Sequence, residues 1–320
     1  MRNNLIICVT PLQMLIAEKI IDLYPDDNYH LLVMYYDDNE KYNYYYKKLS
    51  SKCLVSFRLI MEKESKIYRL YYFFQLVNLL KNKFDSLYYN IYFASVDSFF
   101  IHYICSSINY KDIITFDDGV ANIYKKGLYY KNRDYSLLLR YLRIFLGIRY
   151  NLKEIVSISE KHYTIFNGVE NICKNSVFLP LFISDKERDK ESKEFSIFLG
   201  QPYSEYNIGK NININAILSK IGVINYFPHP RERNLPEAIN IINSNLIIED
   251  YVITLLNQGY NVKVYSFLST ALLNLNSIDN VSAFLIYDKQ LYEKYTDLYE
   301  FFFNSNIETL DLEGEAYCNG

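Results

Sequence analysis

The residues best suited to acid–base chemistry lie in one short stretch of this sequence. His229 is enclosed by Pro228 and Pro230, and Arg231 follows directly. Prolines fix the backbone and exclude helix, so they present an imidazole beside a guanidinium in a rigid loop. Glu205 lies upstream, and a carboxylate can act as a general base while an imidazole acts as a general acid. The stretch predicts an acid/base or phosphate-binding site; the simpler alternative is a turn histidine hydrogen-bonded to the backbone.

Two predicted strands position these residues. Apolar runs at 195–199 and 223–227 each stop at a loop, and the residues between them predict a helix. A strand–helix–strand crossover makes the two strands parallel, and parallel neighbours lie roughly 5 Å apart. Both strands therefore end at one edge, where open α/β sheets bind ligands. We expect the Glu205 and His229 loops to face each other at that edge.

Composition restricts the class of protein. The chain has 320 residues, half of them apolar and 22% charged, which predicts a globular protein of two domains. A net charge of −3 gives no reason to expect a nucleic-acid partner. Five scattered cysteines without a CxxC pair favour a reduced, cytosolic compartment. We see neither a signal peptide nor an apolar run long enough to span a membrane.

Strand and helix patterns alternate along the chain, which predicts an α/β protein with mainly parallel sheets. The first turn carries no GxGxxG, so it does not predict a dinucleotide site. The most polar stretch, 182–194, predicts a linker with a boundary near residue 190. We therefore expect domains at 1–190 and 191–320. The predicted strands are 4–9, 30–36, 54–59, 87–93, 113–116, 195–199, 223–227, 245–248 and 261–266, and the predicted helices include 11–24, 68–81, 96–107 and 135–148.

Two further loops at predicted strand ends carry polar residues. Ser269 and Thr270 follow strand 261–266 and begin a helix, where backbone N–H groups and hydroxyls can bind an anion. The alternative is that they only cap the helix. Asp117 and Asp118 follow strand 113–116; two adjacent carboxylates are not a metal set, so they predict either a turn or a site for hydroxyl groups such as those of a sugar.

A basic and aromatic segment covers residues 124–153. It holds eight Lys or Arg residues and one acid, Asp134, and its middle predicts a helix. Basic residues mixed with Tyr, Leu and Phe are typical of a helix that lies on an anionic membrane. A surface helix with a solvated basic face is the alternative.

Seven short motifs occur in an order that resembles a known family. They are IICVTPLQMLIAEKII, TFDDGVANI, HYTIFNG, FLGQP, PHPRE, IIEDYVI and YSFLSTAL. In this order they resemble the bacterial sialyltransferases of glycosyltransferase family 52, which include lipooligosaccharide α-2,3-sialyltransferases. The resemblance covers about residues 4–310. It implies a GT-B-type fold with two Rossmann-like domains, an N-terminal acceptor-side domain and a C-terminal CMP-donor domain, facing across a cleft.

The resemblance also implies an activity. It implies inverting, metal-independent transfer of sialic acid from CMP-sialic acid to a terminal galactose, without a cofactor. The family's general acid corresponds to His229. Its general base is an Asp, but Tyr203 stands at that position here, so the nearest carboxylate, Glu205, is our candidate base. Ser269 corresponds to the serine that binds the nucleotide phosphate. Other expected donor contacts are Thr270, Arg231, Glu249, Asp250, Gly200 and Gln201, and expected acceptor-side residues are Thr10, Gln13, Asp117 and Asp118.

The implied partners are a nucleotide sugar and a lipooligosaccharide or capsular glycan. The segment 124–153 suits work at the inner face of the plasma membrane, and the family suggests a homodimer. Other functions stay open: a hexosyltransferase that uses a UDP-sugar, a catalytically weak nucleotide- or glycan-binding relative, and a peripheral membrane scaffold.

Overall fold

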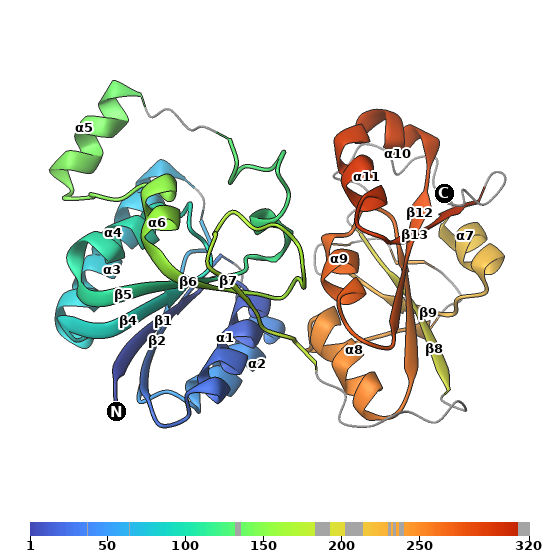
Figure 1. The fold of residues 1–320 in the computed structure, drawn as a ribbon, viewed down its shortest axis with the longest axis horizontal. Helices are drawn as coiled ribbons and strands as arrows, with labels where there is room; N and C mark the ends of the chain where they lie inside the picture. Colours follow the sequence, from blue (N-terminus) through green and yellow to red (C-terminus); the bar gives the residue numbers. More distant parts are fainter. Residues whose placement is uncertain are drawn as a thin grey trace. The chain divides into compact units, whose positions relative to one another are not determined.

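The computed structural model describes residues 1–36, 38–63, 65–131, 136–182, 193–201, 214–229, 232, 235–236 and 240–312. The chain divides into two compact units, Met1–Leu181 and Phe182–Gly320, coloured from blue to green and from yellow to red in Figure 1. Each unit is built around its own sheet. The boundary predicted near residue 190 lies outside the described residues.

The first unit contains a seven-stranded sheet in the order β3-β2-β1-β4-β5-β6-β7. Every described strand pair in it is parallel. Its central strands are almost fully buried, as parallel strands covered on both faces must be. The strands are β1 (Asn3–Cys8), β2 (Asn28–Tyr35), β3 (Val55–Ile60), β4 (Leu87–Phe93), β5 (Asn109–Phe116), β6 (Ser159–Thr164) and β7 (Ser176–Phe178).

Helices cover both faces of this sheet (Figure 1). α1 and α2 lie on one face, and α3, α4 and α6 lie on the other. The start of α1 follows from its sequence, because Thr10 accepts a hydrogen bond from the Gln13 N–H as N-cap and Pro11 occupies the first helical position. The helices are α1 (Pro11–Leu23), α2 (Glu40–Ser50), α3 (Lys66–Lys83), α4 (Phe99–Ser107), α5 (Leu137–Phe145) and α6 (Leu152–Ile158), with a 3-10 turn at Gly119–Asn122.

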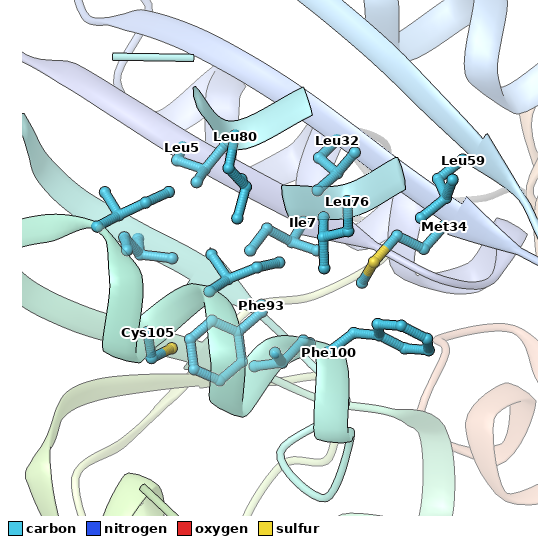
Figure 2. Close-up of a cluster of buried hydrophobic side chains, with 14 of the residues drawn as sticks. Leu5, Ile7, Leu32, Met34, Leu59, Leu76, Leu80, Phe93, Phe100 and Cys105 are labelled. Carbon is cyan, nitrogen blue, oxygen red and sulfur yellow. The ribbon is translucent and has the colours of Figure 1, made fainter. Parts of the chain in front are cut away.

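One hydrophobic cluster joins this sheet to α3 and α4. In Figure 2, Ile7 of β1 lies beside Leu76 of α3, and Leu5, Phe93 and Phe100 belong to the same cluster. All five side chains are at most 8% exposed. This packing fixes the strand ends from which the loops of the first unit project.

The second unit contains a six-stranded sheet in the order β10-β9-β8-β11-β12-β13, and its described strand pairs are also parallel. α8 and α9 lie on one side of it and α7 on the other (Figure 1). The elements are β8 (Glu194–Leu199), α7 (Ile214–Ile221), β9 (Asn225–Phe227), β10 (Asn240–Ile241), α8 (Ile248–Asn257), β11 (Asn261–Ser266), α9 (Thr270–Asn276), β12 (Val281–Tyr287), α10 (Lys289–Lys294), α11 (Thr296–Phe303) and β13 (Glu308–Asp311).

Both sheets share a doubly wound strand order, so the prediction of two Rossmann-like units with parallel sheets is confirmed. In this order the first three strands are added toward one side of the sheet, and from the fourth strand on they are added toward the other side. The reversal therefore lies between the first and fourth strands. The reversal lies between β1 and β4 in the first unit and between β8 and β11 in the second. Ligands of open α/β sheets bind at the carboxyl ends of these strands.

The strand predicted at 245–248 is wrong. Ile248 begins helix α8, and the strand of this region is the short β10. Val252, Leu255 and Leu256 continue the apolar pattern of Ile248 at helical spacing, so the run belongs to a buried helix. Elements that the sequence reading did not identify include α2, β6, β12 and β13.

A buried ion pair joins the carboxyl end of β5 to β6. The Nε2 atom of His162 lies 2.8 Å from Oδ1 of Asp117, and both side chains have no exposed surface. Nδ1 of His162 lies 2.8 Å from the Thr115 hydroxyl oxygen. Burial opposes the charge on His162, but the hydrogen bonds with Asp117 and Cys173 raise its pKa from 6.5 to about 9. His162 is therefore a cation at neutral pH, and it stabilises the sheet edge.

We expect His162→Ala to lower the free energy of unfolding of the first unit by about 3–5 kcal/mol, because the Asp117 carboxylate then stays buried without its charged partner. Urea denaturation at pH 7, followed by circular dichroism, measures the change. Lys125→Ala is the control: it breaks the Lys125–Glu170 pair, whose side chains are 61% and 75% exposed. That pair should contribute at most about 1 kcal/mol. An equally small loss for His162→Ala would contradict the assignment.

The same pair predicts a pH dependence. The folded-state pKa of about 9 exceeds the ordinary 6.5, so the stability that His162 supplies is complete below pH 6.5 and is lost as the pH rises through 9. The wild-type protein should lose stability over this interval, and His162→Ala should lack that part of the loss.

Candidate active site

The reversal point of the second sheet carries Gly200 and Gln201 after β8. The Ser266 hydroxyl, at the end of β11, donates to the Leu199 carbonyl over 3.1 Å and so joins the two strand ends. Gln201 is only 6% exposed, and its amide makes no hydrogen bond to any described residue. A nearly buried amide without a partner among the described residues is suited to binding a ligand here.

His229 lies at the carboxyl end of the neighbouring strand β9, and Glu232 fixes its loop. The His229 N–H donates to Oε2 of Glu232 over 3.2 Å, and the Glu232 N–H donates back to the His229 carbonyl over 2.9 Å. The hydroxyl of Tyr226 donates to Oε1 of Glu232 over 2.6 Å. Tyr226 is fully buried in β9, so the half-buried His229 is tied to the sheet through one carboxylate.

This carboxylate explains why a glycine stands at position 200. A Cβ on Gly200 would lie 2.2 Å from Oε2 of Glu232 and 2.6 Å from the Tyr226 hydroxyl oxygen. No side chain fits there without displacing the anchor of the His229 loop. Burial raises the pKa of Glu232, while the hydrogen bonds from Tyr226 and from the His229 backbone oppose that rise.

Ser269 lies in the loop after β11, at the N-cap position of α9. Its side chain makes no capping hydrogen bond to the helix, although its N–H donates to the Phe267 carbonyl over 2.9 Å. Ser269 is half-buried and Thr270 is exposed. The capping alternative therefore does not account for the Ser269 hydroxyl, which stands at the same edge as Gly200.

Glu249 and Asp250 lie in the first turn of α8 and not in a loop, and both are nearly buried. Oε1 of Glu249 accepts a hydrogen bond of 2.8 Å from the Asn274 amide of α9. Acids in the first turn of a helix are stabilised by its dipole. Glu249 thus joins α8 to α9 behind the strand ends.

The reversal point of the first sheet holds a second polar cluster, centred on Asp118. Gln13 donates 2.6 Å to Oδ1 of Asp118, and Tyr129 donates 2.7 Å to Oδ2. Ser95, after β4, donates to Oδ2 over 3.2 Å and accepts from Gln13 over 2.9 Å. Gln13 is itself held by the Val9 N–H, which donates to its Oε1 over 2.7 Å. The half-buried Asp118 carboxylate is well oriented to accept a hydrogen bond from a ligand hydroxyl.

Asp117 and Thr10 hold the neighbouring backbone rather than the Asp118 carboxylate. Asp117 has no exposed surface, and besides His162 its oxygens accept from Thr164, Asn171 and the Ile165 N–H. Thr10 caps α1. These residues hold the loops, and Gln13 and Asp118 are the members of the predicted acceptor-side set that lie in the cluster.

Three residues of the predicted site, Glu205, Arg231 and Tyr203, lie outside the described residues. Three residues of the site were not singled out from the sequence: Glu232, Ser95 and Tyr129. Only Glu232 had a visible signal, since it follows the proline-bounded histidine loop directly. Within the described part of the chain, no group of three or more His, Cys, Asp or Glu residues is arranged to hold a metal ion. None of the helices in that part is long and apolar enough to cross a membrane.

Comparisons with known proteins show which family the chain belongs to. The profile of Glycosyltransferase family 52 matches residues 27–289. The CMP-N-acetylneuraminate:beta-galactoside alpha-2,3-sialyltransferase of Pasteurella multocida is 28% identical over 311 residues, 97% of this chain and 99% of the relative. An N-acetyllactosaminide alpha-2,3-sialyltransferase of Haemophilus influenzae is 31% identical over 283 residues, 87% of this chain and 90% of the relative. The crystal structure of the glycotransferase of kitacinnamycin has a TM-score of 0.48 at 8% identity, with 98% of this chain and 87% of that chain covered.

The chain belongs to glycosyltransferase family 52. The resemblance seen in its motifs is confirmed, and the protein is a glycosyltransferase. In this glycosyltransferase the two polar clusters lie at the strand ends where each sheet reverses, one in each unit.

A double-mutant cycle tests the contact between Gly200 and Glu232 in this glycosyltransferase. We expect Gly200→Ala to destabilise the second unit by about 1–3 kcal/mol, because the new methyl group collides with the carboxylate. Glu232→Ala should cost about 1–2 kcal/mol through lost hydrogen bonds. The double variant should be more stable than the sum of both losses predicts, because the collision with the carboxylate is gone and only the contact with Tyr226 remains. Urea denaturation measures all four proteins, and strictly additive losses would contradict the contact.

Proposed function

We propose that this glycosyltransferase is an inverting sialyltransferase that moves sialic acid from CMP-sialic acid to a terminal galactose of a bacterial surface glycan. The observation that carries the proposal is the position of His229, anchored by Glu232 beside the reversal point where Gly200 and Ser269 lie. The two sialyltransferase relatives, similar over most of the chain, support sialic acid as the transferred sugar.

The proposed reaction needs charge neutralised on a leaving phosphate. The acceptor hydroxyl oxygen attacks the anomeric carbon of sialic acid, and the bond from that carbon to the CMP phosphate oxygen breaks. His229 gives its proton to the phosphate as general acid. The Ser269 hydroxyl and the amides that follow it bind the phosphate and stabilise its developing charge. Gln201 and Gly200 line the same strand ends, with Arg231, Thr270, Glu249 and Asp250 as further candidates for donor contacts.

The acceptor hydroxyl must lose its proton in the same step. Glu205 is the proposed general base, since its loop follows β8, the direct neighbour of β9. In the first unit we propose that the Asp118 cluster, with Gln13, Ser95 and Tyr129, holds hydroxyl groups of the acceptor. We assign Thr10 and Asp117 to the support of this cluster. No cofactor or resident metal takes part in the proposed mechanism.

The assay that tests this proposal follows CMP release from CMP-sialic acid with a galactose-terminated acceptor. We expect turnover by the wild-type chain. His229→Ala and Glu205→Gln should each lower it at least ~100-fold, because general acid and base catalysis each contribute about 10²–10⁴-fold. Lys289→Gln, a change on α10 far along the chain from both loops, is the control and should keep full activity.

Several results would contradict the proposal. Consumption of a UDP-sugar without any CMP release would identify a hexosyltransferase. CMP binding without turnover of any donor would identify a binding protein. An unchanged rate in Glu205→Gln would remove Glu205 as the base and leave the role of His229 to be judged by its own variant.

We also propose that α5 docks the protein on an anionic membrane at the cytoplasmic face. Five apolar residues of this helix are at least 70% exposed, and Arg143 is turned inward, where it binds the Tyr150 carbonyl. Arg140 is exposed among them, and Arg149 follows the helix. An apolar helix with basic flanks is typical of interfacial binding. The five residues are Leu137, Leu138, Tyr141, Ile144 and Phe145.

Vesicle sedimentation tests this surface. We expect binding to vesicles that contain phosphatidylglycerol, and we expect it to weaken as salt is raised, because screening reduces the electrostatic attraction. Leu138→Ser with Phe145→Ser should abolish binding. Leu23→Ser with Leu54→Ser, at other exposed leucines, should leave it unchanged. A dimer that the first pair of changes splits into monomers, without any vesicle binding, would show that α5 is a subunit interface instead.

A further inference from the structure

A pocket of about 120 Å³ lies in the first unit, apart from the Asp118 cluster. It opens where β2 and β3 end and where α3 begins. None of the residues that line it belongs to the proposed active site. They are Tyr36, Met61, Lys63, Arg69, Tyr72 and Phe100.

The floor of the pocket is rigid and mostly apolar. Met61, Tyr72 and Phe100 are each at most 8% exposed, and Figure 2 shows Phe100 at the margin of the hydrophobic cluster. The Tyr72 hydroxyl accepts a hydrogen bond of 3.2 Å from the Lys63 N–H, which fixes the segment after β3. Such a floor suits the carbon-bound face of a sugar ring.

The mouth of the pocket is cationic. Nζ of Lys63 donates to the Tyr68 hydroxyl over 3.1 Å and lies 4.7 Å from the centre of that ring. The hydrogen bond with Tyr68 raises the pKa of Lys63, so the amine stays charged at neutral pH. The Arg69 guanidinium makes no hydrogen bond or ion pair with any described residue. No carboxylate stands among the described residues that line the pocket.

Two cations stand at one mouth; Glu62 is the carboxylate that acts on Lys63, and it is not among the described lining residues, so the pair favours an anionic ligand. A guanidinium binds phosphate and carboxylate groups through paired hydrogen bonds, and an ammonium adds a point charge. Arg69 and Tyr72 also lie in the first turns of α3, an 18-residue helix without an acid in its first turn. Its dipole therefore adds to the positive potential.

We propose that this pocket binds an anionic substituent, a phosphoryl or carboxyl group, on an inner sugar of the acceptor glycan. The inference rests on the proposed function, since it supplies a second contact for the same acceptor. The volume of about 120 Å³ is roughly ten times the minimum of ~10–15 Å³ that holds one water molecule, which accommodates such a group.

The sheet places the pocket within reach of the proposed acceptor site. β2 is the direct neighbour of β1, and β1 is the neighbour of β4, whose end carries Ser95. Neighbouring strands lie about 4.8 Å apart, so the ends of β2 and β4 are roughly 10 Å apart. One oligosaccharide can therefore present a galactose hydroxyl at Asp118 while an inner sugar fills the pocket.

The test compares two acceptors in the transfer assay: a neutral galactose-terminated disaccharide, and the same disaccharide with a phosphate on its inner sugar. We expect the wild-type chain to have a KM at least about tenfold lower for the phosphorylated acceptor, because one hydrogen bond to a charged group changes affinity by about that factor. Lys63→Gln with Arg69→Gln should remove this preference and leave kcat and the KM for the neutral acceptor unchanged. Lys81→Gln with Lys83→Gln, at the other end of α3, should keep the preference.

Isothermal titration with the phosphorylated disaccharide separates this inference from the proposed function. Binding that Lys63→Gln with Arg69→Gln abolishes would support the pocket even if CMP-sialic acid were not a donor. Equal KM values for both acceptors in an active wild-type enzyme, or binding that survives the double variant, would overturn the inference. If the phosphorylated disaccharide does not bind and Lys63→Gln with Arg69→Gln weakens binding to vesicles that contain phosphatidylglycerol, the anionic group belongs to a lipid, and the assignment to the acceptor is wrong.

Discussion

Parallel strand pairing is the constraint on which the rest of this structure depends. Because all described pairs in both sheets run in one direction, every loop after a strand leaves from the same edge. Strand pairing alone therefore places residues that are distant in sequence at one edge of each sheet. Gln13, Ser95 and Asp118 follow three different strands and still share hydrogen bonds. Gly200, His229 and Ser269 are collected in the same way in the second unit.

At each edge, one carboxylate holds the backbone through several hydrogen bonds. Asp117 is enclosed by protein donors and holds β5 against β6, while the next residue, Asp118, turns to the polar cluster. Glu232 has the first role in the second unit, where it ties His229 to Tyr226. The polar groups that would meet substrate are thus oriented by a second set that does not reach it.

Local patterns were sufficient to predict the class of fold and the strands β8 and β11, because buried parallel strands are short apolar runs that end at turn residues. They failed at residues 245–248, where an apolar run of strand length opens a buried helix. His229 was singled out as a candidate because its prolines restrict the loop locally. Glu232 was not, because its role depends on Gly200 and Tyr226, which meet it only after the sheet has formed. Ser95 and Tyr129 were missed for a similar reason, because they meet Asp118 only after the first sheet has formed.

The Asp117–His162 pair also affects how the fold can change during evolution. Its partners are 45 positions apart, so the intervening chain, with α5 and α6, forms a loop whose two ends are fixed by one buried contact. Doubling the length of such a loop costs only about 0.6 kcal/mol in closure entropy. Changes of length near the exposed α5 should therefore be tolerated, whereas Tyr129 and Ile155 of the same segment are packed in the core and constrain it elsewhere. The exposed part of the segment between β5 and β6 can therefore vary in length while the buried pair keeps the ends of the two strands together.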